Sequence, residues 1–426
     1  MSTKYTFAAA LFAIGLLLAA CSSSKSDDIV EEEVTGTVEA RDFKEETFDV
    51  SKMAQLELDN INGNMTFKTG KPGQVTVRAT RVGRGDDAEA AQNRLGTMSV
   101  DIKQNGDAIS VVADVGTIKG SKKPAWAGKR VDFLVVAQED ISVKLTNGAG
   151  AITVAGITGG VSITAGNIKA SLSNIRGGVS VVSQSGAVIV DGASGPSKFE
   201  SRDASFSIAR LSSPSLSIAS SADIIIKDTQ VEGDIAAKSA SGKLSLQRLK
   251  GRNIKAEVGP GTVELTDVTA DKGITVEAHE GRVYINRVNS ELLKVVNTSG
   301  NMDLAEVQGG VELTTDSGRI SLSKVTPSSL VVRGGAGNVA LNGQLPQVGE
   351  GSVKTTSGAI SVTVPRESSL ALDATTKGGK ISVDPKFGLA LQDSSAGRVI
   401  GMANGGTMQL TLVSESGNIN VGTGQR

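Results

Sequence analysis

Short segments in which apolar and polar residues alternate follow one another along most of the chain, and turn residues separate them. Residues 299–316 form one such unit, which contains two alternating apolar pairs and a single apolar residue after the first pair: Met302/Leu304, Val307 and Val311/Leu313. Alternation with a period of two is typical of β-strands that bury one face. Each unit therefore predicts two short strands and a turn.

The unit recurs in steps of 16 to 21 residues, which is the behaviour of a repeat protein. Apolar residues stand two, four and, in most units, seven places after a turn residue. Glycine at this position supplies the backbone conformation of a sharp corner, and we expect the serine that often precedes it to bond to the turn backbone. The turn residues are Gly150, Gly166, Gly186, Ala204, Ala222, Gly242, Gly261, Gly281, Gly300, Gly318, Gly337, Gly358, Gly379, Gly397 and Gly417.

These units predict an all-β fold, a single parallel β-solenoid over residues 141–422 with about fifteen coils and a period near 19. One unit cannot bury its own apolar face, so it must stack on its neighbours. Parallel strands lie about 4.8 Å apart, so the rod would be roughly 70 Å long. Aromatic residues make up 3% of the chain, and we expect a thin coil to hold large rings poorly.

Residues 41–140 are less regular and predict a β cap that covers the open end of the solenoid. Seven strand candidates are separated by turns, and one helix interrupts them over residues 87–95, where Asp86 and Asp87 would cap a run of helix formers. The strand candidates are Phe43–Val50, Leu56–Leu58, Met65–Lys68, Val75–Ala79, Met98–Ile102, Ile109–Ala113 and Val131–Ala137.

Residues 1–20 have the features of an export signal: one charge at Lys4, an apolar run from Phe7 to Leu18, and small residues before Cys21. The end of this segment is similar to a bacterial lipobox, which predicts that Cys21, the one cysteine of the chain, is lipidated. Residues 21–40 are polar and acidic and predict a disordered tether. We therefore expect a membrane anchor through the N-terminal lipid, at the outer membrane in a Gram-negative source.

The segment from Gly116 to Arg130 is basic and holds Trp126, the one tryptophan of the chain. It predicts a loop that contacts phosphate headgroups or an anionic glycan. The alternative is that the tryptophan pins the loop to the body of the protein while the cations face water. The candidate contact residues are Lys122, Lys123, Trp126, Lys129 and Arg130.

Three consecutive motifs resemble the putative-adhesin family of bacterial envelope proteins: Val131–Val136, Ile141–Gly148 and Gly150–Val154. The resemblance covers roughly residues 40 to 422, and it implies an extended strand, repeated Ser-Gly coils and a short helix before them. The chain lacks the proline usual in that family at residues 137–139 and has more coils than most members. The motifs are structural, so the resemblance implies no catalytic residue.

Enzymes that act on glycans are also built on β-solenoids, and such an enzyme would need a pair of carboxylates on one face. The acidic residues are scattered, Asp303 is expected to face outward alone, and the best pair is Asp203 with Asp223 beside two turns. His279, the one histidine, is expected at a corner. Two short motifs, Gly334–Asn338 and Arg84–Asp86, are too short to carry a calcium-binding or integrin-binding prediction. We expect no catalytic residue, metal or cofactor.

The chain has 44 basic and 45 acidic residues, which disfavours nucleic-acid binding. The leading hypothesis is a non-catalytic, lipid-anchored cell-envelope protein whose solenoid binds a partner, a glycan or another cell. One alternative is a periplasmic scaffold or sensor in envelope-stress signalling. A second is a glycan-active enzyme on the same scaffold. The sequence does not determine the oligomeric state.

Overall fold

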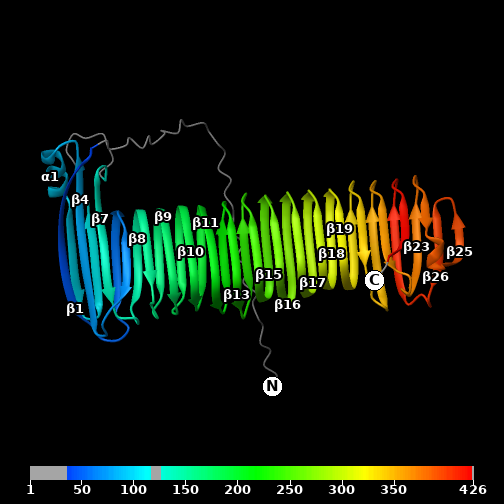
Figure 1. Ribbon diagram of the computed structural model, residues 1–426, viewed down its shortest axis with the longest axis horizontal. Helices are drawn as coiled ribbons and strands as arrows, with labels where there is room; N and C mark the ends of the chain where they lie inside the picture. The colour runs from blue at the N-terminus through cyan, green and yellow to red at the C-terminus, as the bar shows by residue number, and fades with distance from the viewer. Residues whose placement is uncertain (1–35, 117–125, 425–426) are drawn as a thin grey trace, which may run out of the picture.

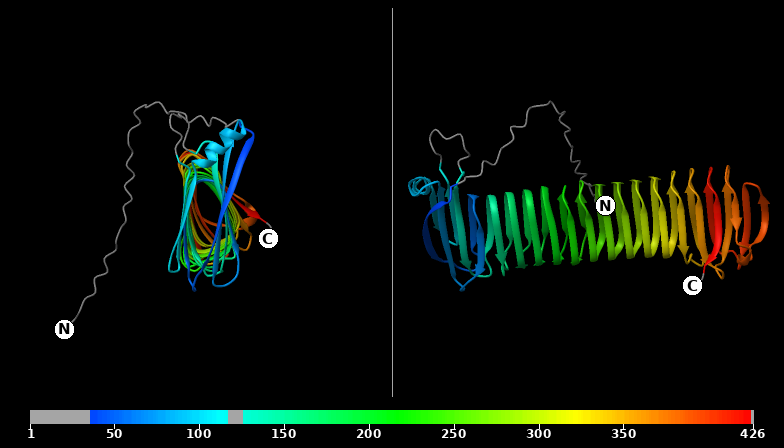
Figure 2. Two further views of the ribbon diagram at one scale, coloured as in Figure 1. Left: turned by 90° about the vertical axis from the view of Figure 1, so that its left-hand side faces the viewer. Right: turned by 45° about the horizontal axis from the view of Figure 1, so that its top comes forward.

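The computed structural model describes residues 36–116 and 126–424, and these form a long all-β rod (Figure 1). Seen end-on, its cross-section is a flattened coil with two long faces (Figure 2, left). The predicted parallel β-solenoid with a period near 19 and an N-terminal β region with one short helix is confirmed. Within the described residues, no helix has the length and hydropathy needed to cross a membrane.

Each coil contributes one strand segment to each long face. We call the face that begins just after the turn residue face A, and the face that follows it face B. In β19 (Ile320–Gly334), Ile320 and Leu322 point inward from face A, and Leu330 and Val332 point inward from face B. The strand bends at the corner between them, which is why several strands are 14 to 18 residues long.

About 12 turns follow one another in chain order, each displaced from the last by 18 to 21 residues. Ile320 pairs with Met302 on one side and Val339 on the other, as the sequence pattern predicted. The strands are β8 (Ser142–Ala155), β9 (Val161–Ile175), β10 (Val179–Ser194), β11 (Ser197–Ser213), β12 (Leu216–Ser220), β13 (Ile224–Val231), β14 (Ile235–Ser239), β15 (Leu244–Pro260), β16 (Val263–Glu280), β17 (Val283–Ser299), β18 (Met302–Ser317), β19, β20 (Val339–Gly343) and β21 (Gly349–Thr355).

The apolar residue seven places after each turn is buried because the backbone kinks at the residue before it. Val307 is buried, and Glu306 has a φ of 54°, in the left-handed region. This kink interrupts the alternation and turns a third side chain inward. The same geometry recurs in successive coils, so a spacing of three residues after two alternating ones marks the corner between the two faces.

The N-terminal end of the rod is assembled out of chain order. Two short strands, β2 (Gln55–Asn62) and β3 (Met65–Thr69), form a coil that stacks on β8. The next coil outward comes from β6 (Ala108–Asp114) and β7 (Lys129–Ala137). Strands from both sides of position 140, the predicted boundary between cap and solenoid, therefore belong to one stack of coils.

Antiparallel strands then close this end. On face A, β4 (Gln74–Gly85) pairs with β7, and β1 (Val38–Asp49) pairs with β4 as the outermost strand. On face B, β5 (Ser99–Asn105) pairs with β6. The predicted helix is α1 (Ala88–Gly96), capped by the side chain of Asp87, which accepts a hydrogen bond from the Ala90 amide at 2.7 Å.

The C-terminal end departs from the sequence prediction in the order of its coils. The last segment, β27 (Met408–Ser414) and β28 (Ile419–Gly424), lies between the coil of β21 and β22 (Ile360–Pro365) and the coil of β23 (Leu370–Thr376) and β24 (Ile381–Val383). The expected order of turns, Gly358 to Gly379 to Gly397 to Gly417, is therefore wrong.

Gly397 does not mark a coil, because it lies in the turn of an antiparallel hairpin between β25 (Ala390–Ser395) and β26 (Arg398–Ala403). A short 3₁₀ helix, η1 (Pro385–Phe387), precedes this hairpin. The open end of a parallel stack exposes unpaired backbone groups, and a hairpin that pairs with β23 covers them on face B. Both ends of the rod thus finish with antiparallel strands.

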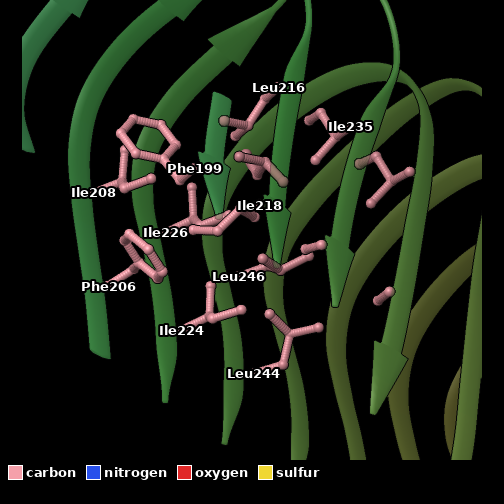
Figure 3. Packing of buried hydrophobic residues seen from close by; sticks show 14 of the residues in the cluster. Phe199, Phe206, Ile208, Leu216, Ile218, Ile224, Ile226, Ile235, Leu244 and Leu246 are labelled. Carbon is pink, nitrogen blue, oxygen red and sulfur yellow. The ribbon is translucent and has the colours of Figure 1, made fainter. Parts of the chain in front are cut away.

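Aliphatic columns fill the interior of the rod, and Figure 3 shows part of them. The expectation that a coil holds large rings poorly is wrong for β11. Phe199 and Phe206 are both buried in that coil, with ring centroids 5.9 Å apart in an edge-to-face arrangement. Such pairs add to the stabilisation that burial of their area provides.

In several turns, the side chain that bonds to the turn glycine is a serine or threonine three places before it, rather than the serine next to it. The Ser414 hydroxyl accepts a hydrogen bond from the Gly417 amide at 2.8 Å, and the Thr376 hydroxyl accepts one from the Gly379 amide at 3.1 Å. Buried hydroxyls satisfy turn backbone groups that would otherwise lack a partner.

Candidate functional site

A shallow groove of about 900 Å³ crosses the strands on face B of the first coils. Its lining comes from β5, β6, β2, β8, β9, β10, β11 and β12, in the order in which these strands lie along the rod. The groove therefore runs parallel to the rod axis and perpendicular to the strands. A ligand that lies in it must be long and narrow.

The groove exists because the corners of these coils lack bulky side chains. Gly159-Gly160, Gly177-Gly178 and Gly195-Pro196 occupy equivalent turns in successive coils. Gly178 has a φ of 94°, and a Cβ atom there would lie 2.7 Å from the carbonyl oxygen of Pro196. Glycine is the residue that fits such a position. The groove ends beyond Ser217, where the next turn carries Glu232 and Asp234.

One column of outward side chains runs along the floor of the groove, one residue per coil. In order along the rod it contains Ser110, Glu57, Lys144, Ser162, Ser180, Lys198 and Ser217. Parallel coils repeat about every 4.8 Å, so these groups form a regular ladder. The hydroxyls of Ser162, Ser180 and Ser217 have no hydrogen-bond partner within the described part of the chain.

The charges along the groove are balanced within the protein. The Lys144 ammonium lies 2.7 Å from a Glu57 carboxylate oxygen, and the hydrogen bond from this carboxylate raises the pKa of Lys144. The Lys198 ammonium lies 2.9 Å from Glu200. Among the described lining residues, Glu57 is the one carboxylate. The groove therefore suits a ligand with little net charge.

A second hollow, of about 780 Å³, lies at the N-terminal end of the rod. Trp126, Arg84, Arg130 and Glu39 line it, and Gly36, the first described residue, lies in its wall. Trp126 is 41% exposed, although the other residues that line this hollow belong to the folded end of the rod. We call this hollow the Trp126 pocket.

Hydrogen bonds hold the charged side chains of the Trp126 pocket in place. The Arg84 Nη2 atom donates to Glu39 at 2.6 Å, and Arg41 donates to the same carboxylate. The bond from Arg84, then the bond from Arg41, lowers the pKa of Glu39 to about 2. The Arg130 Nε atom donates to Asp132 at 3.0 Å. Glu39 is thus ionised at neutral pH.

The structure places the five predicted contact residues differently from one another. Trp126 and Arg130 lie together in the pocket. Lys122 and Lys123 lie outside the described residues, as does Cys21. Lys129 also lines the pocket, but it is only 2% exposed and so offers little surface for contact.

The Lys129 side chain instead holds the two ends of the basic segment together. Its ammonium donates to the carbonyl oxygens of Val115, at 2.7 Å, and Gly116, at 3.2 Å. Burial lowers the pKa of Lys129 because the charged form loses its hydration there. The backbone amide of Lys129 also donates to the Trp126 carbonyl at 2.9 Å. The position of the tryptophan is therefore set by the fold.

Comparison with known protein families gives one match, to Toastrack DUF4097, over residues 201–422. The matched region is more than half of the chain. The chain belongs to this family. None of the curated proteins compared with this Toastrack chain matches it.

Several solved structures are similar to this Toastrack chain at low identity. A putative cell adhesion protein from Clostridium sporogenes is 8% identical, with 90% of this chain and 100% of that chain covered and a TM-score of 0.18. A putative adhesin from Parabacteroides merdae is 9% identical, with 66% and 96% covered and a TM-score of 0.29. A putative adhesin from Bacteroides fragilis is 12% identical, with 66% and 97% covered and a TM-score of 0.20. Superpositions this loose do not transfer a site or a function.

The acidic residues of the Toastrack chain are mostly engaged by neighbours. Asp303 faces outward as expected, but it is not alone, because Arg282 lies 2.6 Å away and Arg319 lies 3.1 Å away in adjacent coils. Asp203 accepts a hydrogen bond from the Ser221 hydroxyl at 2.8 Å, and Asp223 accepts one from the Lys243 amide at 2.7 Å. Both carboxylates therefore form hydrogen bonds at turns, as their sequence positions suggested.

The remaining sequence candidates lie apart from both hollows, except for Arg84, which lines the Trp126 pocket. His279 is exposed near the end of β16. Asn338, in the glycine-rich stretch, accepts a hydrogen bond from the Ala359 amide at 2.9 Å and so supports a turn. The Arg84–Asp86 tripeptide begins at the end of β4, where Gly85 is buried against α1. Arg84 itself is bonded to Glu39.

One feature of the Toastrack rod was not found from the sequence. The residues at the left-handed corner position alternate in charge in successive coils: Arg210, Asp228, Arg248, Asp267, Arg287, Glu306 and Lys324, all with φ between 50° and 57°. Arg248 bonds to Asp228 at 2.8 Å, and Arg287 bonds to Asp267 at 2.8 Å. We call this column the corner charge ladder. The charges six places after each turn were visible in the sequence, but their backbone conformation was not.

Proposed function

We propose that the protein is a non-catalytic, lipid-anchored cell-envelope protein whose rod binds a linear glycan along the face B groove. The observation that carries this proposal is the ladder of hydroxyl and amino groups, with one carboxylate at Glu57, that places one side chain per coil along a groove parallel to the rod axis. A polysaccharide chain presents hydroxyl groups at regular intervals of similar length. A serine hydroxyl can both donate to and accept from such groups.

The chemistry of the groove supports binding in preference to cleavage. Hydrolysis of a glycosidic bond ordinarily uses two carboxyl groups on opposite sides of the bond. Glu57 is the one carboxylate among the described lining residues, and Lys144 binds it at 2.7 Å. The free serine hydroxyls and the surface over the turn glycines remain for contact with the ligand.

The anchor is the second part of the proposal. Cys21 follows an apolar segment and small residues, as a lipidated cysteine does, so the protein would be held in the cell envelope, at the outer membrane in a Gram-negative source. Substitution Cys21→Ser should abolish labelling with a lipid precursor and release or stall the protein. A variant that still labels and stays in the membrane fraction would contradict this part.

The binding part is tested with the chain from Ser22 to Arg426, which keeps every described residue, and with purified peptidoglycan as the probe. Substitution Ser180→Trp fills the groove and should abolish co-sedimentation. Ser171→Trp is the matched control, because Ser171 is an exposed serine on face A of the neighbouring coil. Equal binding by both variants would contradict the glycan proposal. If Ser180→Trp lost a protein partner in pull-downs instead, the scaffold hypothesis would gain support.

A further inference from the structure

The chain enters the described part of the rod beside the Trp126 pocket. Gly36 and Thr37 line the pocket, and β1 begins one residue later, at Val38. Fourteen residues separate Cys21 from Gly36. A chain of that length spans at most about 50 Å when fully extended. A lipid on Cys21 would therefore keep this end of the rod close to the bilayer.

We propose that the N-terminal end of the rod rests on the membrane and that the Trp126 pocket holds the phosphate of an anionic lipid headgroup. This inference rests on the proposed lipid anchor. A membrane is the expected partner of this pocket because Gly36, which lines it, is the residue at which the proposed anchoring segment joins the described fold.

The side chains in the pocket suit the boundary between lipid and water. Tryptophan is enriched at that boundary because its ring is apolar and its indole N–H is polar. Arg130 uses only its Nε to bind Asp132, and Arg84 uses Nε and Nη2 to bind Glu39. The other guanidinium N–H groups of these two residues have no partner among the described residues, so they can bind a phosphate, which arginine holds with two parallel hydrogen bonds.

Glu39 acts as an internal counterion that competes with this phosphate. Its carboxylate binds both Arg84 and Arg41, and these bonds lower its pKa to about 2, so it is ionised at neutral pH. Removing its charge should therefore strengthen binding to an anionic surface, whereas removing an arginine should weaken it. These opposite effects distinguish a headgroup site from a structural ion pair.

The chain from Ser22 to Arg426 lacks the lipid, so its binding to vesicles tests this site independently of the anchor. Vesicles of phosphatidylglycerol and phosphatidylethanolamine should bind the chain, and phosphatidylcholine vesicles should bind it far more weakly. One cation near an anionic surface contributes about five-fold in affinity. Arg84→Gln with Arg130→Gln should therefore weaken binding by about 25-fold, and Glu39→Gln should strengthen it about five-fold.

Arg333→Gln is the matched control. Arg333 lies on β19, far along the rod, and it is paired with Glu312 as the pocket arginines are paired with carboxylates. The substitution removes the same charge and should leave vesicle binding unchanged. Thermal melts of all variants report whether each one is folded. Equal binding to anionic and neutral vesicles, or equal loss in Arg333→Gln and the pocket variants, would overturn the inference. Failure of Cys21 to label would instead overturn the proposed anchor and leave the vesicle result standing.

Discussion

The first coils of the rod, from Ser142 to Ser217, and the later coils, from Ile224 to Gly334, share one interior and differ in their corners. Val179 and Val181 in β10 are buried as Val311 and Leu313 are in β18. Successive turns of the first coils are Gly-Gly or Gly-Pro pairs and form a groove, whereas most of the equivalent turns in the later coils carry at least one larger side chain. The later coils carry most of the corner charge ladder. The interior therefore sets the fold, and the corners decide what each part of the surface can contact.

A charge placed in the shared interior should have the largest effect, and it should be equally large in both regions. Leu322→Asp removes a buried leucine that stacks between Leu304 and Leu341 and places an unpaired carboxylate there. The cost should be about 3–5 kcal/mol. Ile163→Asp in the first coils should lower the free energy of unfolding by a similar amount. Limited proteolysis would locate the damage in adjacent coils, since coils contact only their neighbours.

Ser321→Asp is the control for this prediction, because Ser321 points outward beside Leu322 and should tolerate a charge. If Ser321→Asp destabilised the rod as much as Leu322→Asp, the assignment of inward and outward positions would be wrong.

A side chain at a turn glycine should have the next largest effect. Gly300 has a φ of 113°, and a Cβ atom there would lie 1.9 Å from the carbonyl oxygen of Gly281 in the adjacent coil. Gly300→Ala should therefore lower the free energy of unfolding by about 1–3 kcal/mol, which is the cost of a strained backbone conformation. Chemical denaturation would measure this loss. The reverse change at the other corner, Arg248→Gly, should cost much less, because φ is 51° there and glycine adopts this conformation readily. Equal losses at both positions would show that the two corners do not differ in this way.

The corner charge ladder should have the smallest effect, and that effect should depend on pH. The hydrogen bond from Arg287 lowers the pKa of Asp267. The ion pair therefore stabilises the folded state at pH values above the ordinary aspartate pKa, and this contribution is lost as the pH falls through the lowered value. Thermal melts of Asp267→Asn should show a small deficit near neutral pH that disappears in acid and in high salt. A deficit that grew in acid would contradict this role.

The sequence was sufficient to predict the period, the two faces and the neighbours of Ile320, because these follow from the spacing of apolar residues. It could not predict the order of the last coils. Ile360 could stack equally well on Ile381 or on Ile419, since the two later segments have the same pattern, and the structure places Ile419 beside it. The local pattern specifies that a segment is a coil but does not specify which coil is its neighbour.

The groove and the Trp126 pocket were hidden from sequence reasoning for different reasons. The groove depends on side chains that are missing at the corners, such as the one that Gly178 lacks. The pocket joins Glu39, Arg84 and Trp126, which are far apart in the chain and meet only when β1, β4 and β7 pair. The burial of Lys129 was not predicted, because a lysine in a basic segment is usually solvated, whereas here two carbonyl groups bind its ammonium inside the fold.

Site-specific photo-crosslinking can decide whether the first coils bind a linear glycan and the later coils do not. A crosslinking residue is placed at Ser180 in the groove or at Thr275, which occupies the same column of face B in a later coil. Each protein is irradiated with purified peptidoglycan. We predict capture of glycan from position 180 and none above background from position 275. Equal capture at both positions, or capture at position 275 alone, would contradict the account.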